Sequence, residues 1–325
     1  GRAADGMASL ALGRVLREHA APVHAIDFSK DGEVMLTAAE DDRVCLYDCQ
    51  KGILKAASQC ISLGIGLARF THDPVSLLIT ARQAAVRQGN GLDSLNSAGE
   101  IRYLSLHDNR FLRAFRGHTD AVCSLEISPK EDIFASASSD RTARIWDLRS
   151  DDCQGELQLN GQPSQPALSF DPHGIVLAAG LPGNVVKLFD VRKLSNGPFI
   201  RFKLEFEEDL DFANIKFSFD GKLMLLGTAQ GCVIALDSFS GEVFKTYRGH
   251  ANSQQLPLAA CFTHDADTVL SGSEDGSVWR WSTQTGEPLP VLTAHAGPVR
   301  VVQCNPTRKL VASACSVTCL WLDDE

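Results

Sequence analysis

The chain alternates between short apolar runs and polar, turn-forming segments along its whole length. Within the runs, apolar and polar residues alternate with a period of two, which predicts strands with one buried face. Seven runs end in an aromatic or apolar residue, and in five of these the next residue is Asp. The endings recur at intervals of about forty residues, with one longer interval, and are Tyr47-Asp48, His107-Asp108, Trp146-Asp147, Phe189-Asp190, Leu236-Asp237, Trp281-Ser282 and Trp321-Leu322.

A recurrence near forty residues with this ending is typical of a WD-repeat β-propeller. The third repeat is the clearest, because turn formers divide it into four strand-like runs: Ala121–Pro129, Ile133–Ser138, Thr142–Asp147 and Glu156–Leu159. Four antiparallel strands make one blade. We therefore predict an all-β fold, a seven-bladed WD-repeat β-propeller, which usually serves as a docking surface.

The two ends of the repeat pattern are incomplete in complementary ways. The last repeat, Val299–Trp321, has three strands, and Leu10–Leu16 precedes the first repeat without a sheet of its own. We predict that Leu10–Leu16 pairs with the last blade, because closing the ring removes two exposed sheet edges. The predicted organisation is a leader or cloning remnant over 1–7 and one propeller over 8–325, with a mobile polar insertion over about 82–99 in the second blade.

Four side chains recur at matching positions in three repeats and predict a hydrogen-bonded tetrad. In the third repeat Asp140 can accept from the ring of His118, and the ring can bond Ser136. The Ser136 hydroxyl can in turn meet the indole N–H of Trp146, and such a satisfied buried network stiffens a blade. The corresponding residues are His19, Thr37, Asp41 and Tyr47 in the first repeat, and His250, Ser271, Asp275 and Trp281 in the sixth.

The same residue types could build a hydrolase triad. A catalytic triad would occur once, however, whereas this set recurs at matching offsets. We therefore interpret the tetrads as structural and expect no catalytic residues and no enzymatic activity. The fourth and fifth repeats lack the polar set, so their blades are expected to depend on apolar packing.

Charge and cysteine content narrow the function classes further. The net charge of −9 argues against direct nucleic-acid binding, which needs clustered Lys and Arg. No apolar run is long enough to cross a bilayer, so we expect no membrane partner. Most of the 10 cysteines lie in or beside strand-like runs, which indicates free thiols in a reducing intracellular compartment. The pairs Cys45/Cys49 and Cys315/Cys319 could suggest a metal, but structural zinc needs four ligands, so we expect packing roles, no metal and no cofactor.

An ordered set of segments resembles the WD-repeat-containing protein eighty-two or Swd-two family of eukaryotes, from about Val15 to Trp321. The main departure from the family pattern is the longer insertion at 87–99 in the second blade. The segments that carry the resemblance are Leu46–Gln50, Ile101–Asn109, Phe115–His118, Trp146–Arg149, Cys153–Gly155, Ser169–Pro172, Val186–Asp190, Gly197–Phe199, Ser271–Gly276 and Ala312–Ser316.

This resemblance implies a non-catalytic, chromatin-associated adaptor in the nucleus. It implies two kinds of complex: COMPASS, which is built on a SET-domain histone methyltransferase, and protein phosphatase type one with a PNUTS-like targeting subunit, which acts at transcription termination. It also implies an association with the serine-phosphorylated C-terminal domain of RNA polymerase II.

Five arginines are candidates for phosphopeptide contacts, because a guanidinium group forks onto phosphate oxygens. They lie at or beside blade-joining loops and the turns that share one face with these loops. Each could equally be a solvated charge or a partner for a neighbouring Asp. The five are Arg17, Arg43, Arg116, Arg141 and Arg248.

Two further segments carry alternative interpretations. The residues Trp146, Asp147 and Arg149 match the WD-x-Arg form, which in some propellers docks the adaptor of cullin-RING ubiquitin ligases. A substrate receptor of such a ligase is therefore the alternative function, although Arg149 could simply stabilise its blade. The acidic stretch Glu205–Asp211 could receive a basic peptide or could be a solvated loop.

Overall fold

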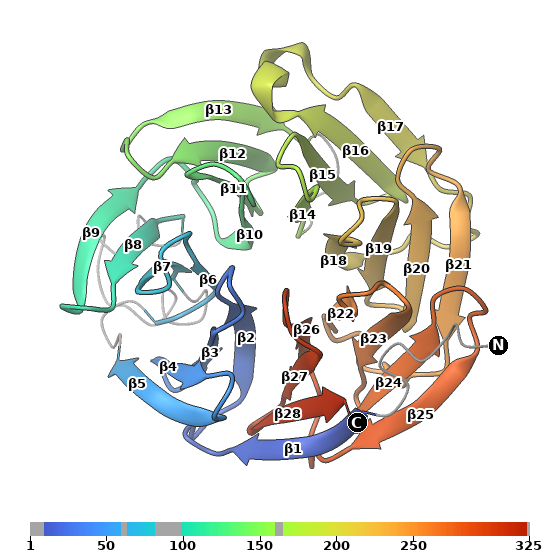
Figure 1. The fold of residues 1–325 in the computed structure, drawn as a ribbon. Helices are drawn as coiled ribbons and strands as arrows, with labels where there is room; N and C mark the ends of the chain where they lie inside the picture. The colour runs from blue at the N-terminus through green and yellow to red at the C-terminus, as the bar shows by residue number, and fades with distance from the viewer. Residues whose placement is uncertain (1–9, 60–63, 82–98, 160–164, 324–325) are drawn as a thin grey trace.

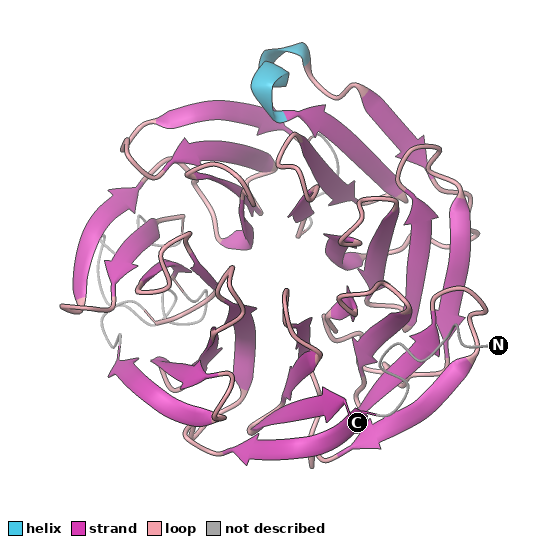
Figure 2. Ribbon diagram, viewed as in Figure 1, coloured by secondary structure: helices cyan, strands magenta, loops and turns pink. Residues whose placement is uncertain are grey.

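Seven four-stranded antiparallel sheets are arranged around a central axis in the computed structural model (Figure 1). The structure describes residues 10–59, 64–81, 99–159 and 165–323. The predicted leader over 1–7 and nearly all of the predicted insertion over 82–99 lie outside these residues. The seven-bladed β-propeller predicted from the repeat pattern is confirmed (Figure 2).

Each blade is a meander whose first strand is innermost and whose last strand is outermost; we call the four positions a to d. Blades one to three follow this order directly. Blade one contains β2 (Val23–Phe28), β3 (Val34–Ala39), β4 (Arg43–Asp48) and β5 (Ile53–Gln59). Blade two contains β6 (Ala68–Phe70), β7 (Ser76–Thr80), β8 (Ile101–Ser105) and β9 (Arg110–Phe115). Blade three contains β10 (Val122–Ile127), β11 (Ile133–Ser138), β12 (Thr142–Asp147) and β13 (Cys153–Gln158).

The remaining blades repeat the meander, with one short 3₁₀ helix inserted in blade four. Blade four contains β14 (Ala167–Phe170), β15 (Val176–Leu181), β16 (Val185–Asp190), η1 (Val191–Asn196) and β17 (Ile200–Lys203). Blade five contains β18 (Phe212–Phe217), β19 (Leu223–Thr228), β20 (Cys232–Asp237) and β21 (Val243–Arg248). Blade six contains β22 (Ala260–Phe262), β23 (Thr268–Gly272), β24 (Ser277–Ser282) and β25 (Pro288–Thr293). Blade seven contains β26 (Val301–Cys304), β27 (Leu310–Ala314), β28 (Thr318–Asp323) and β1 (Leu10–Leu16).

The ring is closed by β1, which supplies the outermost strand of blade seven. It pairs antiparallel with β28 from Leu10 opposite Asp323 to Leu16 opposite Thr318. Figure 1 shows the blue first strand beside the red last strand. Leu10 and Leu16 are buried, whereas Leu12 points outward and is 46% exposed. The closure predicted from the incomplete first and last repeats is therefore confirmed.

Apolar contacts between neighbouring blades form the core. The b strands are buried on both sides, as in β3 and β7, while the outer strand β5 is almost entirely exposed. Blades four and five share one cluster that includes Ala178, Phe202 and Leu226. This packing is what the sequence predicted for the two blades that lack the polar set, and it lets them stack without a tetrad.

Strand direction gives the propeller two distinct faces. The a and c strands end at one face, so this face carries the a–b and c–d turns; we call it the turn face. The opposite face carries the b–c turns and the blade-joining loops; we call it the loop face. On the turn face, Gly32 in the Asp31-Gly32 turn has a φ of 70°, which glycine adopts without strain. No helix in the described residues has the length and apolar character needed to cross a membrane.

Candidate functional site

The four residues of the blade-three tetrad lie within hydrogen-bond distance of one another. His118 Nδ1 is 2.9 Å from Asp140 Oδ2, and its Nε2 is 2.8 Å from the Ser136 hydroxyl. Trp146 Nε1 donates to the same hydroxyl at 2.8 Å. Trp146 and Ser136 are fully buried, and His118 is buried. The structure thus links the loop before β10, strand β11, the b–c turn and strand β12.

The donors and acceptors present set the direction of these hydrogen bonds. Indole N–H can only donate, so Ser136 accepts from Trp146, while the Asp140 carboxylate can only accept. Nδ1 of His118 then carries the hydrogen that points at Asp140. Burial raises the pKa of Asp140, but hydrogen bonds from His118 and Thr142 outweigh it and hold this pKa well below its usual range. The carboxylate is therefore the fixed anion at the end of the network.

The blade-one set is brought together with one difference. His19 Nε2 lies 2.7 Å from the Thr37 hydroxyl, and its Nδ1 lies 3.2 Å from Asp41. The hydroxyl of Tyr47 donates to Glu18 at 3.0 Å. A phenol reaches farther than an indole N–H, so the fourth member engages a carboxylate outside the set.

The tetrad predicted for blade six is not formed. Trp281 Nε1 donates to the carbonyl oxygen of Arg248 at 3.2 Å, and the Ser271 hydroxyl donates to the carbonyl of Gly272. Asp275 accepts from Ser277 instead of from the histidine.

Aromatic neighbours give a physical reason for this difference. The Trp281 ring lies among those of His250, Tyr247 and Trp279, at centroid distances of 5.7, 5.8 and 5.8 Å. This packing aims its N–H at the backbone rather than at Ser271. The buried Nδ1 of His250 has no hydrogen-bond partner among the described residues.

A further tetrad occurs in blade seven, and sequence reasoning missed it. His295 Nε2 lies 2.7 Å from the Ser313 hydroxyl, which also accepts from Trp321 Nε1 at 2.7 Å. Nδ1 of His295 faces Cys315 Sγ at 3.2 Å, where blades one and three have Asp. The signal was the separation of 18 residues between the histidine and the hydroxyl, which is the same in blades one, three and seven.

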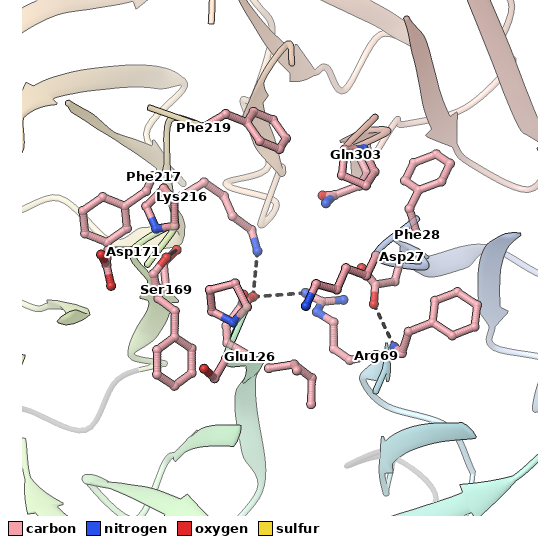
Figure 3. Close-up of a pocket in the computed structure, with 18 of the residues that line it drawn as sticks. Asp27, Phe28, Arg69, Glu126, Ser169, Asp171, Lys216, Phe217, Phe219 and Gln303 are labelled. Carbon is pink, nitrogen blue, oxygen red and sulfur yellow. Dashed lines mark hydrogen bonds and ion pairs between the residues drawn. The ribbon is translucent and has the colours of Figure 1, made fainter. Parts of the chain in front are cut away.

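The seven a strands share one equivalent position near the axis of the propeller, and at six of the seven the side chain lines an axial cavity, Cys261 being the exception. Each is the next-to-last residue of its strand, and four of them carry charge: Asp27, Arg69, Glu126, Ser169, Lys216, Cys261 and Gln303. Glu126 accepts from Lys216 Nζ at 2.7 Å and lies 3.5 Å from Arg69 (Figure 3). Lys216 belongs to blade five and Glu126 to blade three, so this ion pair joins two blades that are not adjacent in the ring.

These ion pairs lie between two cavities. The cavity toward the turn face has a volume of about 370 Å³ and is walled by a–b turn residues such as Pro172 and Phe219. The cavity toward the loop face has a volume of about 300 Å³. Burial raises the pKa of Asp27, although Arg69 and the backbone N–H of Phe70 oppose this shift.

The five candidate arginines are placed on the loop face, but nothing in the described residues gathers them into one cluster. Arg43 donates to the carbonyl of Glu18, and Arg116 pairs with Glu100 at 3.2 Å. Arg17, Arg141 and Arg248 are exposed, as is Arg116 despite its ion pair. Arg116 and Arg141 flank blade three, whereas Arg17 and Arg248 belong to other blades.

The WD-x-Arg motif lies on a c–d turn of the turn face. Arg149 is exposed, and its guanidinium group donates two hydrogen bonds, of 3.0 and 2.9 Å, to the carboxylate of Asp147. Trp146 is buried, so only Asp147 and Arg149 of the motif can meet a partner. Arg192 and Asp190 form the same arrangement in blade four.

The acidic stretch Glu205–Asp211 joins β17 to β18 on the loop face. Its acidic residues are exposed, while Leu210 is buried. Asn184 fixes the stretch by donating to the carbonyl of Glu208 and accepting from the N–H of Leu210, both at 2.8 Å. It is therefore an anchored acidic loop.

Comparison with known proteins agrees with the repeat architecture. The WD domain, G-beta repeat family matches residues 11–48, 109–147 and 241–282. WD repeat-containing protein 82 of Drosophila melanogaster is 40% identical over 97% of this chain and 94% of its own length. The chain belongs to the WD repeat-containing protein 82 family.

Two fungal proteins are also similar to this family member. COMPASS component SWD2 of Saccharomyces cerevisiae is 27% identical over 94% of this chain and 92% of its own length. Set1 complex component swd2 of Schizosaccharomyces pombe is 33% identical over 67% of this chain and 57% of its own length. The resemblance inferred from the ordered segments is thereby confirmed.

The described part of this WD repeat-containing protein 82 family member contains no cluster of three or more His, Cys, Asp or Glu side chains suited to a metal ion. Its recurring polar sets are internal and lie between strands of single blades. Two axial cavities and two broad faces are open to other molecules. This arrangement suits the binding of other molecules.

His250 is expected to make this family member sensitive to mild acid. Burial lowers the pKa of His250 to about 4. In the unfolded chain this histidine becomes protonated below pH ~6.5, whereas in the folded protein it stays neutral until about pH 4. The free energy of unfolding therefore falls as the pH falls from ~6.5 to about 4, by on the order of 3 kcal/mol. Denaturant unfolding of His250→Gln at several pH values should show a flatter dependence. His173→Gln, at an exposed site, should keep the wild-type slope; an equal slope in both variants would contradict the assignment.

Glu126 is expected to stabilise the propeller across its axis. Glu126→Gln leaves Lys216 and Arg69 without their shared carboxylate, and their side chains are only 24% and 22% exposed. Breaking a buried pair costs about 3–5 kcal/mol, and contact with the axial cavities should reduce this to about 2 kcal/mol. Ser169→Ala at the equivalent position of blade four should cost less than about 1 kcal/mol. Equal midpoints in urea for wild type and Glu126→Gln would rule out this role.

Proposed function

We propose that the protein is a non-catalytic scaffold subunit of nuclear, chromatin-associated complexes that link RNA polymerase II transcription to histone methylation. The observation that carries the proposal is its similarity, over nearly the whole chain, to COMPASS component SWD2 and to WD repeat-containing protein 82. The structural counterpart is a closed propeller whose recurring His-containing sets connect its own strands. Its partner is proposed to be a SET-domain histone methyltransferase subunit.

A scaffold of this kind can bind an extended segment of its partner in two ways. The segment can add a strand to an exposed outer strand, or it can fill a groove. The d strands offer exposed apolar side chains for the first mode, such as Ile53, Phe111 and Val243. The cavity of about 370 Å³ on the turn face offers a site for the second.

The proposal is tested by affinity purification of the tagged chain from nuclear extract. We expect the SET-domain methyltransferase to be recovered, and we expect the chain alone to show no methyl transfer. Recovery of neither this enzyme nor a phosphatase-targeting subunit would count decisively against the proposal. Methyl transfer by the purified chain would contradict its assignment as a non-catalytic subunit of the methyltransferase complex.

A second complex is proposed on the family resemblance alone: protein phosphatase type one with a PNUTS-like targeting subunit, acting at transcription termination. The same purification tests it, because the two partners are distinguished by mass spectrometry. We expect the two assemblies to separate by size. A purification that contains the methyltransferase without any phosphatase subunit would remove this part of the proposal.

Binding to the phosphorylated C-terminal domain of RNA polymerase II is proposed for the loop-face arginines. Arg17, Arg141 and Arg248 are exposed, and a guanidinium group forks onto phosphate oxygens. Fluorescence anisotropy with serine-phosphorylated and unphosphorylated repeat peptides tests this directly. We expect the phosphorylated peptide alone to bind, and charge reversal at Arg17 and Arg248 to weaken it at least tenfold. Equal binding of both peptides would refute the assignment.

The alternative function, a substrate receptor of a cullin-RING ubiquitin ligase, depends on the exposed guanidinium of Arg149. Arg149→Ala should then abolish binding of the ligase adaptor without unfolding the chain. Arg192→Ala is the matched control, since Arg192 makes the same two hydrogen bonds to Asp190 on blade four. Unchanged adaptor binding in Arg149→Ala, or no adaptor binding by the wild type, removes this function.

A further inference from the structure

Two cysteines share one histidine nitrogen in blade seven. Nδ1 of His295 lies 3.2 Å from Cys315 Sγ and 3.9 Å from Cys319 Sγ. Cys315 directly follows β27, and Cys319 lies in β28 opposite Ser313. Because side chains two residues apart on a strand share a face, Ser313 and Cys315 point toward the same histidine as Cys319.

The hydrogen bonds around His295 allow its Nδ1 to carry a hydrogen toward the sulfur of Cys315. Ser313 accepts from the indole of Trp321 at 2.7 Å, which leaves its own proton free to be donated to Nε2 of His295, 2.7 Å away. A neutral imidazole whose Nε2 accepts must carry its hydrogen on Nδ1. That hydrogen points at Cys315 Sγ, and a thiolate accepts it better than a thiol does.

The tetrads of blades one and three show which kind of group lies opposite the histidine Nδ1. In blades one and three the atom facing histidine Nδ1 belongs to a carboxylate, Asp41 or Asp140, which is an anion. Cys315 occupies the same place in blade seven. The backbone N–H of Cys315 is bonded to the Val317 carbonyl at 3.0 Å, so the turn that presents the sulfur is fixed.

The electrostatics of the cysteines agree with this geometry. Burial raises the pKa of Cys315, but the hydrogen bond from His295 and those from Val317 and Ser316 outweigh it and bring the pKa to about 6. Burial raises the pKa of Cys319 to about 12, and the neighbouring Cys315 adds to this, while Arg17 opposes it. One sulfur is thus suited to act as a nucleophile and the other to remain protonated until needed.

We propose that Cys315 is a thiolate that reduces hydroperoxides and that Cys319 resolves the product as a disulfide. The Cys315 sulfur attacks one oxygen of hydrogen peroxide, so that an S–O bond forms and the O–O bond breaks. The hydroxide that leaves takes a proton and becomes water. Cys315 becomes a sulfenic acid. The Cys319 sulfur then attacks it, forming the S–S bond, and the hydroxyl leaves as a second molecule of water with the thiol proton.

Access to the sulfur is limited but present. Cys315 is 5% exposed and borders Ser316, which is exposed at the tip of the b–c turn on the loop face. Cys319 is fully buried, so it is reached from inside the blade. This arrangement admits a molecule as small as hydrogen peroxide and disfavours bulky disulfides, which suits an oxidation-sensitive site rather than a thiol-exchange site.

The first test measures alkylation of the native wild-type chain by iodoacetamide as a function of pH, with each cysteine quantified by peptide mass spectrometry. We expect labelling of Cys315 to rise with a midpoint near pH 6, whereas an ordinary thiol has a midpoint near pH ~8.5. At pH 7 its thiolate fraction would be about 90%, against about 3% for an ordinary thiol. An ordinary midpoint, or no labelling of Cys315 at any pH, would overturn the proposal.

The second test follows oxidation by hydrogen peroxide. No Lys or Arg follows Lys309, so one tryptic peptide carries both cysteines, and an internal disulfide appears as a loss of two hydrogens. We expect this product in wild type and a sulfenic acid trapped by dimedone in Cys319→Ser. Cys304→Ser, at another buried thiol, should oxidise as wild type does. Trapping of Cys315 sulfenic acid in wild type without disulfide would refute the resolving role.

Discussion

Removing β1 is expected to abolish cooperative folding of the propeller. The strand contributes the outer edge of blade seven and buries Leu10 and Leu16. Each of these side chains is worth about 1.5–3 kcal/mol, and the freed edge of β28 becomes a site for aggregation. Because domains are stable by only about 5–15 kcal/mol, deletion of 1–16 should give a chain that aggregates or melts at a much lower temperature.

A matched deletion of 1–9 leaves β1 whole and should keep the wild-type melting curve. At single-residue level, Leu16→Ala should cost about 2–4 kcal/mol, whereas Leu12→Ala, at an exposed position of the same strand, should cost less than about 1 kcal/mol. Size-exclusion chromatography and thermal unfolding give the readout. A monomeric, cooperatively folded 17–325 chain would show that the ring does not need this strand.

Replacing Asp140 by Ala is expected to destabilise the protein by on the order of 3 kcal/mol. The carboxylate accepts from His118 at 2.9 Å, from the N–H of Thr119 at 3.0 Å, and from the hydroxyl of Thr142 at 2.7 Å. Its loss leaves buried donors without partners, and hydrogen bonds to a charged group are worth about 1.5–3 kcal/mol. Denaturant unfolding at pH 7 measures the change.

Blade six supplies the control for this prediction. Asp275 occupies the matching sequence position but accepts from residues of its own turn, Ser277 and Ser273. Asp275→Ala should therefore cost clearly less than Asp140→Ala. Equal losses would mean that the histidine network contributes nothing beyond the turn that both aspartates stabilise.

The repeat pattern was sufficient to predict the architecture, because strand alternation and the period of the blade endings are local properties. Closure by Leu10–Leu16 followed from counting strands at the two ends. The tetrad of blade three followed from residue types, since His118, Ser136, Asp140 and Trp146 can satisfy one another in only one way. These features depend on chemistry that can be recognised from single positions and their spacing.

The side-chain arrangements of blades six and seven could not be predicted from the sequence. The blade-six residues have the right types, but the rings of Tyr247 and Trp279 decide where the indole of Trp281 points. In blade seven a thiol replaces the carboxylate, so a search for Asp overlooks it. The axial ion pair between Glu126 and Lys216 joins blades that are not adjacent, and only the ring geometry brings them together.

The proposed scaffold role requires physical contact between this propeller and a SET-domain histone methyltransferase. The decisive measurement is size-exclusion chromatography with light scattering on the two purified proteins, mixed at micromolar concentration. The account predicts one peak with the summed mass of a one-to-one complex, and a lost peak when the β1-deleted chain replaces the wild type. Separate elution of a folded wild-type chain and a folded methyltransferase would contradict it.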